Sequence, residues 1–214
     1  LIQFDRVELQ GVCFSYRQQQ HVTFTVGPID LTLRRGEVVF ITGSNGSGKT
    51  TLMKLLTGLY TPDQGTLRLD DEELTDPALY RSLFTSVFMD HHLFGPAYGI
   101  DVSDRNRVQA LLRRFNLEGI VRLEHGRFAP LQLSTGQRKR LAMVVALLED
   151  RPVYVLDEWA AHQDPYLRRY FYETLLPELR AAGKTIVAIS HDARFFHLAD
   201  RRLHLVQGQL RPAD

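Results

Sequence analysis

The stretch VVFITGSNGSGKTTLMKLL, residues 38–56, decides the fold of this 214-residue chain. It passes from an apolar strand through glycines into an amphipathic helix, and it fits the P-loop spacing Gly-x4-Gly-Lys-Ser/Thr at Gly43, Gly48, Lys49 and Thr50. The glycines of such a loop let backbone N–H groups approach phosphate oxygens, and the helix amino terminus adds roughly half a positive charge. The stretch therefore predicts a phosphate site, with a ligand-free glycine-rich turn as the alternative.

The expected phosphate contacts come from this loop and from the first turn of its helix. Lys49 would supply a point charge, and the Thr50 hydroxyl would bind Mg²⁺. The residues expected to bind the nucleotide phosphates are Gly43, Ser44, Asn45, Gly46, Ser47, Gly48, Lys49, Thr50 and Thr51.

An acidic pair follows a second apolar stretch, RPVYVLDE at residues 151–158. Its apolar residues indicate a buried strand, and Asp157 and Glu158 emerge at the carboxyl end, where open α/β sheets place their ligand chemistry. We expect Asp157 to hold Mg²⁺ through water and Glu158 to polarise an attacking water, which favours hydrolysis over binding alone. A solvated acidic turn is the simpler alternative.

Two more side chains are candidates for the same site. His191 directly follows the strand-like TIVAIS at residues 185–190, so the fold would bring it to the same sheet edge, within reach of a γ-phosphate. A histidine at a strand end is otherwise a cap or a packed polar group. Tyr16 shares a strand face with Val12 and Phe14 and is a candidate for stacking on an adenine ring, although an isolated aromatic is more often part of a core.

A second helix start lies in LSTGQRKR at residues 133–140. Helical spacing of the apolar residues predicts a helix with Ser134 as its amino cap, on the stripe Leu141, Val144, Val145 and Leu148. Ser134 and Gln137 also form a capping box, which would satisfy the helix's own N–H groups and contribute ~1 kcal/mol. Capping leaves Gly136 unexplained, because glycine in the first turn costs up to ~1 kcal/mol relative to alanine unless something approaches its backbone closely. The basic run at residues 138–140 is compatible with phosphate and equally with a solvated helix face.

Composition narrows the class of protein. Hydrophobic residues make up 44% and charged residues 24%, and 26 basic against 25 acidic side chains leave a net charge of +1, which gives no support to a nucleic-acid partner. The single Cys13 excludes an internal disulfide and favours a reducing compartment, with the cytosol as the default. No apolar run reaches the ~20 residues of a membrane helix. The chain starts at Leu1 rather than Met, which suggests a piece of a longer protein.

The order of elements predicts an α/β fold with a mainly parallel central sheet. Strand-like runs fill the first third, at Ile2–Leu9, Val22–Val26, Ile29–Leu33, Val38–Thr42 and Thr66–Leu69. Helices then alternate with apolar strands at Thr85–Phe88, Val153–Leu156, Thr185–Ser190 and Arg201–Val206. Between Phe88 and Leu133 we expect helix and no strand. The prediction is one domain over residues 1–214, with a core of 1–76 and 151–214 and an inserted helical subdomain of about 77–150.

GSNGSGKT, LSTGQ and VYVLDE, in this order and at this spacing, resemble the motifs of ABC-transporter nucleotide-binding domains. The resemblance spans nearly the whole chain and implies a P-loop ABC ATPase fold: a RecA-like mixed sheet core, an antiparallel β subdomain and an inserted helical subdomain. It implies ATP and Mg²⁺ as cofactors, Tyr16 as the adenine-stacking aromatic, His191 as the switch histidine and Asp164 as the D-loop residue. Asp164 followed by Pro165 is also an ordinary helix start.

The resemblance further implies why one chain carries two helix starts suited to phosphate. In ABC domains two copies pack head to tail, and each ATP lies between the P-loop of one copy and the signature helix of the other. A two-fold homodimer of this kind is isologous. Ser134, Gly136 and Gln137 would then contact the nucleotide held by the partner.

One segment departs from the family pattern. VFMDHHLF at residues 87–94 places Met89 where the family usually carries Gln. A methionine cannot contact Mg²⁺ as an amide oxygen does, and our hypothesis is that Asp90 takes over contact with the metal or the attacking water.

Together with LLEDRP and DEWAAHQDP, this segment resembles the cyclic-peptide exporter group, which includes exporters of the pyoverdine-precursor, syringomycin and microcin type. His162 stands where that group has Asp. The resemblance implies the ATPase domain of an exporter of a peptide or peptide-siderophore precursor, on the cytoplasmic face of the inner membrane, with its transmembrane domain on the same polypeptide. The alternatives are a soluble ABC ATPase not coupled to transport, or a regulator that binds ATP without hydrolysing it.

Overall fold

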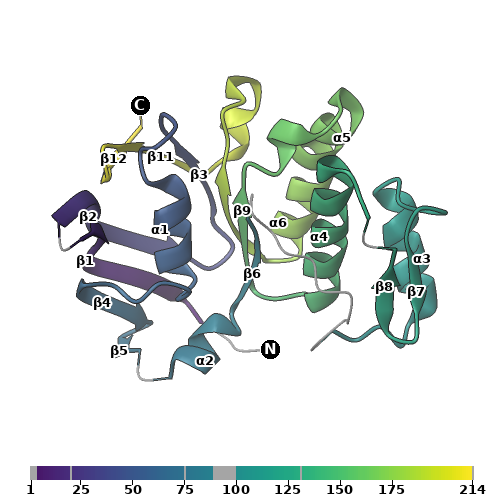
Figure 1. Cartoon of the computed structure of the whole chain (residues 1–214), viewed down its shortest axis with the longest axis horizontal. Coiled ribbons are helices and arrows are strands. Elements are labelled where there is room, and N and C mark those ends of the chain that lie inside the picture. The colour runs from purple at the N-terminus through teal and green to yellow at the C-terminus, as the bar shows by residue number, and fades with distance from the viewer. Residues whose placement is uncertain (1–3, 20, 75, 89–99, 131, 214) are drawn as a thin grey trace.

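The computed structural model describes residues 4–19, 21–74, 76–88, 100–130 and 132–213 (Figure 1). Its central element is a six-stranded sheet in the order β12-β11-β3-β10-β9-β6. The strands are β3 (Val38–Thr42), β6 (Phe84–Val87), β9 (Val153–Asp157), β10 (Thr185–Ile189), β11 (Arg201–Val206) and β12 (Gln209–Pro212). All neighbours are parallel except β11 and β12, which pair antiparallel. The predicted α/β fold with a mainly parallel sheet is confirmed.

Apolar runs form the middle of this sheet because it is covered on both faces. Every residue of β9 and β10 is buried, the pattern expected of strands in a covered parallel sheet. Successive residues of β3 alternate between two hydrophobic clusters: Val39 and Ile41 pack with α1 (Lys49–Leu56), whereas Val38 and Phe40 pack with α4 (Thr135–Glu149). This alternation places the phosphate loop at the end of a strand anchored in two cores.

A second sheet packs on the α1 side and is wholly antiparallel, in the order β2-β1-β4-β5. Its strands are β1 (Arg6–Gln18), β2 (His21–Arg34), β4 (Gln64–Leu69) and β5 (Glu72–Glu73). The two strands expected at Val22–Val26 and Ile29–Leu33 form the single strand β2, since both pair with β1 on either side of Pro28. In Figure 1 this sheet lies beside α1, away from α4 and α6.

The remaining elements are short. The helices are α2 (Pro77–Arg81), α3 (Arg105–Arg114), α5 (Pro165–Tyr170) and α6 (Leu176–Ala181), with a π-helical turn η2 (Phe171–Leu175) and the 3-10 turns η1 (Ala160–His162) and η3 (Ala193–Leu198). A two-stranded hairpin consists of β7 (Arg122–Glu124) and β8 (Arg127–Ala129).

One sequence prediction is wrong: the region between Phe88 and Leu133 was expected to lack strands, but it contains the β7–β8 hairpin. The predicted division into a core of 1–76 and 151–214 and a helical subdomain of about 77–150 stays a prediction. Within the range of this helical subdomain, β6 pairs with β9 in the central sheet.

Candidate functional site

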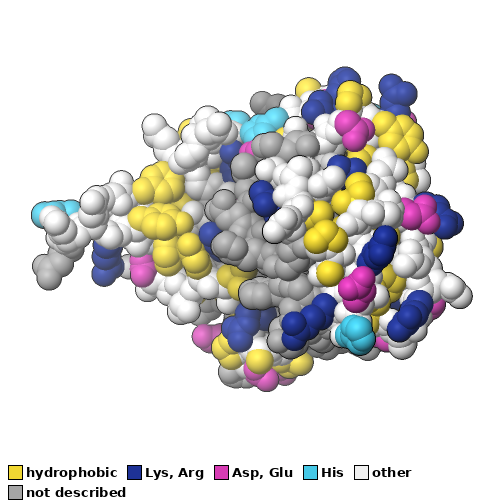
Figure 2. All heavy atoms as spheres, turned by 45° about the vertical axis from the view of Figure 1, so that its right-hand side comes forward, with side chains coloured by type: hydrophobic (Ala, Val, Ile, Leu, Met, Phe, Trp, Pro, Cys, Tyr) yellow, Lys and Arg dark blue, Asp and Glu magenta, His cyan; other side chains and the backbone are white. Residues whose placement is uncertain are grey.

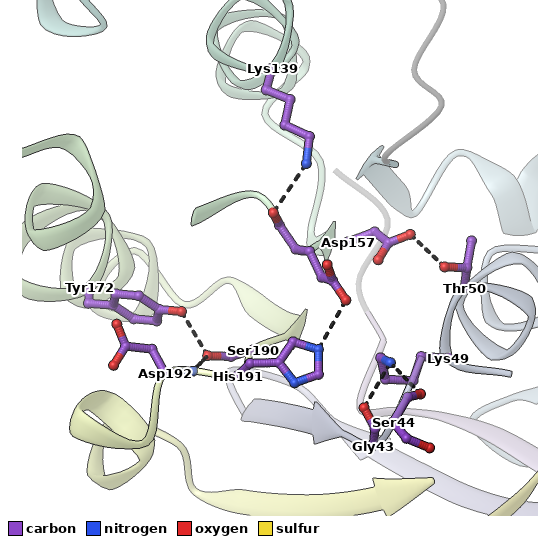
Figure 3. A network of polar contacts seen from close by, with 11 residues as sticks. Gly43, Ser44, Lys49, Thr50, Lys139, Asp157, Tyr172, Ser190, His191 and Asp192 are labelled. Atoms are coloured by element: carbon purple, nitrogen blue, oxygen red, sulfur yellow. Dashed lines mark hydrogen bonds and ion pairs between the residues drawn. The ribbon is translucent and has the colours of Figure 1, made fainter. Parts of the chain in front are cut away.

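The three adjacent strands β3, β10 and β9 bring the candidate residues to one edge of the sheet. The loop 43–48 follows β3, and His191 follows the end of β10. Asp157 is the last residue of β9, and Glu158 comes directly after it. Figure 3 shows the side chains of Lys49, Thr50, Asp157 and His191 gathered there. Neighbouring parallel strands thus assemble residues that lie far apart in the chain.

Lys49 anchors the phosphate loop from within. Its Nζ donates hydrogen bonds to the carbonyl oxygens of Gly43 at 2.9 Å and Ser44 at 3.0 Å. Only 6% of Lys49 is exposed, so the ammonium lies inside the curve of the loop. A buried cation in this position attracts anions to the loop.

Close packing requires glycine at Gly43 and Gly48. Gly43 has φ +146°, and a Cβ there would lie 2.4 Å from the Leu205 carbonyl oxygen. Gly48 has φ +102°, and a Cβ there would lie 2.7 Å from Val26 Cγ2 and 3.2 Å from the Phe24 ring. The loop therefore keeps its path only with residues that lack a side chain.

The helix after the loop begins without a side-chain cap. Gly48 is the amino cap of α1 and accepts no hydrogen bond through a side chain, whereas α2, α3 and α5 each begin at an aspartate that does. The first-turn N–H groups of a helix have no partner within the helix. At α1 this arrangement suits an anion at the positive end of the helix dipole.

Thr50 and Asp157 converge beside the loop. Thr50 Oγ1 donates to Asp157 Oδ2 at 2.8 Å, and Asp157 is 1% exposed. A hydroxyl and a carboxylate are the hard oxygen ligands that Mg²⁺ takes, so this pair fits the ion. No cluster of three His, Cys, Asp or Glu side chains that could hold a metal ion exists within the described ranges.

Glu158 faces His191 across the strand ends. Glu158 Oε1 lies 3.0 Å from His191 Nε2 (Figure 3). Glu158 has φ +49°, a left-handed conformation that is uncommon outside glycine and that costs on the order of 1–3 kcal/mol. The backbone turn at the end of β9 therefore aims the carboxylate at the histidine.

Tyr172 fixes the turn that carries His191. Its Oη lies 2.7 Å from Ser190 Oγ, which in turn accepts a hydrogen bond from the Asp192 N–H at 3.3 Å. The Tyr172 ring stacks on Phe195 with centroids 4.2 Å apart. Burial raises the pKa of the Tyr172 hydroxyl, so this hydroxyl stays protonated.

Tyr16 stands at the mouth of a cleft of about 420 Å³ next to the phosphate loop. Its Oη lies 3.0 Å from Thr51 Oγ1, and 38% of the residue is exposed. Burial raises the pKa of the Tyr16 hydroxyl, which keeps it neutral. The cleft is lined by Tyr16, Phe24, Asn45, Gly46, Gly48, Lys49, Thr50, Thr51 and Glu158.

Phe24 was missed by the sequence reasoning. It pairs with Tyr16 across β1 and β2, so it follows from the strand register. The alternation of Val22, Phe24 and Val26 indicated which face of the strand Phe24 occupies. Its pairing with Tyr16 depends on the register between two strands, which this local pattern does not give.

The predicted second group of nucleotide contacts lies apart from this cleft. Ser134, Gly136 and Gln137 begin α4, and among the described residues they are absent from the cleft lining. The capping box is confirmed: Ser134 Oγ accepts from the Gln137 N–H at 3.2 Å, and Gln137 Oε1 accepts from the Ser134 N–H at 2.9 Å. Asp164 caps α5 by accepting a hydrogen bond from the Leu167 N–H at 3.0 Å, as expected of an aspartate before a proline at a helix start.

Lys139 reaches from α4 to the acidic strand end, which the sequence reasoning did not foresee. It is 3% exposed and its Nζ donates to the Glu158 carbonyl at 3.2 Å (Figure 3). Burial lowers the pKa of the Lys139 ammonium, and the carboxylates of Asp157 and Glu158 oppose that shift. A solvated helix face is therefore wrong for Lys139. Asp90, the expected substitute ligand, lies outside the described residues.

The surface and the helices add two observations. On the face drawn in Figure 2, basic and acidic side chains are interspersed, in line with the net charge of +1. No helix within the described parts of the chain is both long and apolar enough to cross a membrane.

This chain is similar to known proteins. The family model described as ABC transporter matches residues 26–161. The ATP-binding protein SyrD of Pseudomonas syringae pv. syringae is 47% identical over 209 residues, covering 94% of this chain and 37% of that protein. A probable syringafactin export ATP-binding/permease protein, SyfD, of Pseudomonas syringae pv. syringae strain B728a is 32% identical, covering 95% of this chain and 33% of that protein. Both relatives support the resemblance to the cyclic-peptide exporter group.

Among solved structures, a bacterial Atm1-family ABC exporter with ATP bound superposes with a TM-score of 0.79 at 25% identity. The match covers 100% of this chain and 39% of that one. The chain thus spans between 33% and 39% of the length of these three proteins. The predicted ABC fold and ATPase class are confirmed, and this chain belongs to the ABC transporter family.

Proposed function

We propose that this chain binds ATP in the cleft beside Tyr16 and hydrolyses it with Glu158 as general base. The observation that carries the proposal is the 3.0 Å approach of Glu158 Oε1 to His191 Nε2, at an edge shared with the phosphate loop. Glu158 also lines the cleft together with Lys49 and Thr50. A carboxylate held at this place is within reach of a water that attacks the terminal phosphate.

Each residue has a distinct part in the proposed reaction. Lys49 and the uncapped N–H groups of α1 hold the phosphates, and Tyr16 stacks on the adenine. Glu158 takes a proton from the attacking water as the bond from the γ-phosphorus to the leaving oxygen of ADP breaks. His191 orients the Glu158 carboxylate and contacts the γ-phosphate.

Thr50 and Asp157 would hold Mg²⁺, Thr50 directly and Asp157 through water. When bound, the ion neutralises charge on the phosphate oxygens. The proposal that Asp90 adds a contact to the metal or the water concerns a residue outside the described ranges.

We further propose that the chain works as a head-to-tail homodimer. The amino terminus of α4 supports this, since Ser134 is exposed and lies apart from the cleft that holds Lys49. In the dimer Ser134, Gly136 and Gln137 bind the ATP held by the partner, and Asp164 lies at the same interface. One ATP then joins two surfaces that a single chain cannot bring together.

The proposed setting is an exporter of a peptide or peptide-siderophore precursor. The setting is supported by the similarity to SyfD, a probable syringafactin export protein, and to the Atm1-family ABC exporter with ATP bound. We propose a transmembrane domain on the same polypeptide and a position on the cytoplasmic face of the membrane.

Replacing Glu158 with Gln tests the general base. General-base catalysis contributes about 100- to 10,000-fold, so Glu158→Gln should lower kcat by that range while ATP-dependent dimers persist. The measurements are phosphate release and size-exclusion chromatography with ATP, with the transmembrane domain present. Wild-type turnover in this variant would contradict the assignment. A regulator that only binds ATP would show no turnover in the wild type either.

A further inference from the structure

A lysine is buried next to the proposed catalytic carboxylate. Lys139 lies in α4 two residues after Gln137, and it faces the end of β9 rather than solvent (Figure 3). Lysine is seldom this buried unless its charge is compensated, and the carboxylates of Asp157 and Glu158 supply that compensation. The two neighbouring carboxylates therefore explain why a cation is buried at this position.

Two hydrogen bonds join Lys139 to Glu158 and Trp159, one through its side chain and one through its backbone. Lys139 Nζ donates to the Glu158 carbonyl at 3.2 Å, and Trp159 Nε1 donates to the Lys139 carbonyl at 2.8 Å. Trp159 is 1% exposed, so this second bond is shielded from water. Together the two bonds hold consecutive residues of the chain against one turn of α4.

The backbone that these two bonds hold includes Glu158, whose conformation is strained. Glu158 has φ +49°, and a conformation of this kind persists only where the surroundings enforce it. A charge-assisted hydrogen bond to its carbonyl is stronger than a neutral one, so the ammonium is well suited to enforce it. We expect that loss of this donor would let the peptide plane after Glu158 rotate and the carboxylate move away from His191.

We propose that Lys139 is a positioning residue that fixes the Glu158 carboxylate in its reactive orientation, through the hydrogen bond to the Glu158 carbonyl and the hydrogen bond between Trp159 and the Lys139 carbonyl. The inference rests on the proposed role of Glu158. Lys139 is not among the described residues that line the cleft.

The test variant is Lys139→Met, which keeps the length and the apolar stem of the side chain but removes the charge and the donor. Misplacement of a catalytic group by 1 Å can lower the rate about 100-fold, so we expect kcat to fall about 10- to 100-fold. The KM for ATP and the Kd for a fluorescent ATP analogue should stay within about twofold. Lys139→Arg retains charge and donors and should recover at least about a third of the wild-type kcat.

Lys184, which directly precedes β10, offers a matched control because it contacts Asp150 at the carboxyl end of α4. It is 9% exposed, and its Nζ donates to the Asp150 carbonyl at 3.0 Å and pairs with the Asp150 carboxylate at 2.8 Å. Lys184→Met removes the same kind of buried contact far along the helix from Glu158. It should lower the melting temperature as Lys139→Met does and leave kcat unchanged.

The assays use the intact protein that contains this chain, with Glu158→Gln measured in parallel. The positioning role is wrong if Lys139→Met keeps wild-type kcat, or if it and Lys184→Met lose kcat equally. If Glu158→Gln keeps turnover, the general-base proposal fails instead. Should Lys139→Met not fold, Lys139→Leu replaces it, since Leu also lacks both the charge and the N–H donor, and the same kcat criterion applies.

Discussion

At the scale of single residues, Tyr16 would combine two functions that one variant cannot separate. Its ring stands at the mouth of the cleft, and its hydroxyl lies 3.0 Å from the Thr51 hydroxyl in the helix that follows the phosphate loop. The ring would stack on a base, whereas the hydroxyl links β1 to α1. Ala and Phe substitutions distinguish these functions.

Tyr16→Ala should weaken ATP binding, because stacking of a base on an aromatic ring is worth about 1–3 kcal/mol, which is roughly 5- to 150-fold in Kd. Tyr16→Phe keeps the ring and should bind within about twofold of wild type. Titration calorimetry with ATP measures both. Equal weakening in the two variants would show that the hydroxyl, and not the ring, supports binding.

Single residues were predictable where spacing alone defines them. Gly43 to Thr51 follow from a local motif, and Asp157 and His191 follow from strands that end at one sheet edge. Lys139 was not found, because charged residues at helix surfaces are usually solvated. A signal existed: Lys139 precedes Met143 and Ala146 at helical spacing, and all three are buried on α4.

At the scale of elements, α4 has a start and a middle with different environments. Its amino cap is exposed and satisfied by its own capping box, while Lys139 is buried against the end of β9. The capping box and a contact with nucleotide are compatible, since the box uses two donors and leaves the Gly136 backbone open to approach. This helix would thus connect the partner's ATP with the chain's own Glu158.

Ser134→Arg tests the exposed start of α4. The bulky side chain should block the approach of a second copy, so ATP-driven dimers and turnover should be lost while ATP binding to the monomer stays within about twofold. Ser134→Ala is the control: it removes the cap, at a cost of ~1 kcal/mol, without adding bulk. Light scattering with ATP reports the dimer. Dimers in the Arg variant would place the interface elsewhere.

Helices and strands were predicted correctly where they were long and apolar. The predictions were wrong where a turn determines whether a strand forms or where it ends. The β7–β8 hairpin turns at His125 and Gly126, both at positive φ, but His-Gly is a weaker hairpin signal than Asn-Gly or Asp-Gly. Separate strands were expected at Val22–Val26 and Ile29–Leu33, and Gly-Pro pairs such as Gly27-Pro28 usually mark turns, yet β1 pairs with β2 on both sides of this pair. Pairing with a neighbouring strand outweighed the local preference.

At the scale of the whole molecule, the order of strands accounts for the site. The central strands β3, β10 and β9 bring together residues from the beginning, middle and end of the chain, and two hydrophobic clusters hold β3 between them. The sheet is therefore a rigid frame for the phosphate loop. The surfaces that start α4 and α5 are left for a second copy in the proposed dimer.

The buried indole beside Glu158 gives the chain an optical reporter. Trp159 is its only tryptophan, and its N–H bonds to Lys139 while its ring packs against Phe115 and Phe171. An indole in such apolar surroundings emits at short wavelength, and its quantum yield depends on nearby charges. ATP should change the emission of the isolated chain, and Lys139→Met should alter the resting emission before any nucleotide is added. If ATP leaves the emission unchanged, neither α4 nor the end of β9 responds to the nucleotide. If Lys139→Met leaves it unchanged, the indole does not sense the Lys139 ammonium.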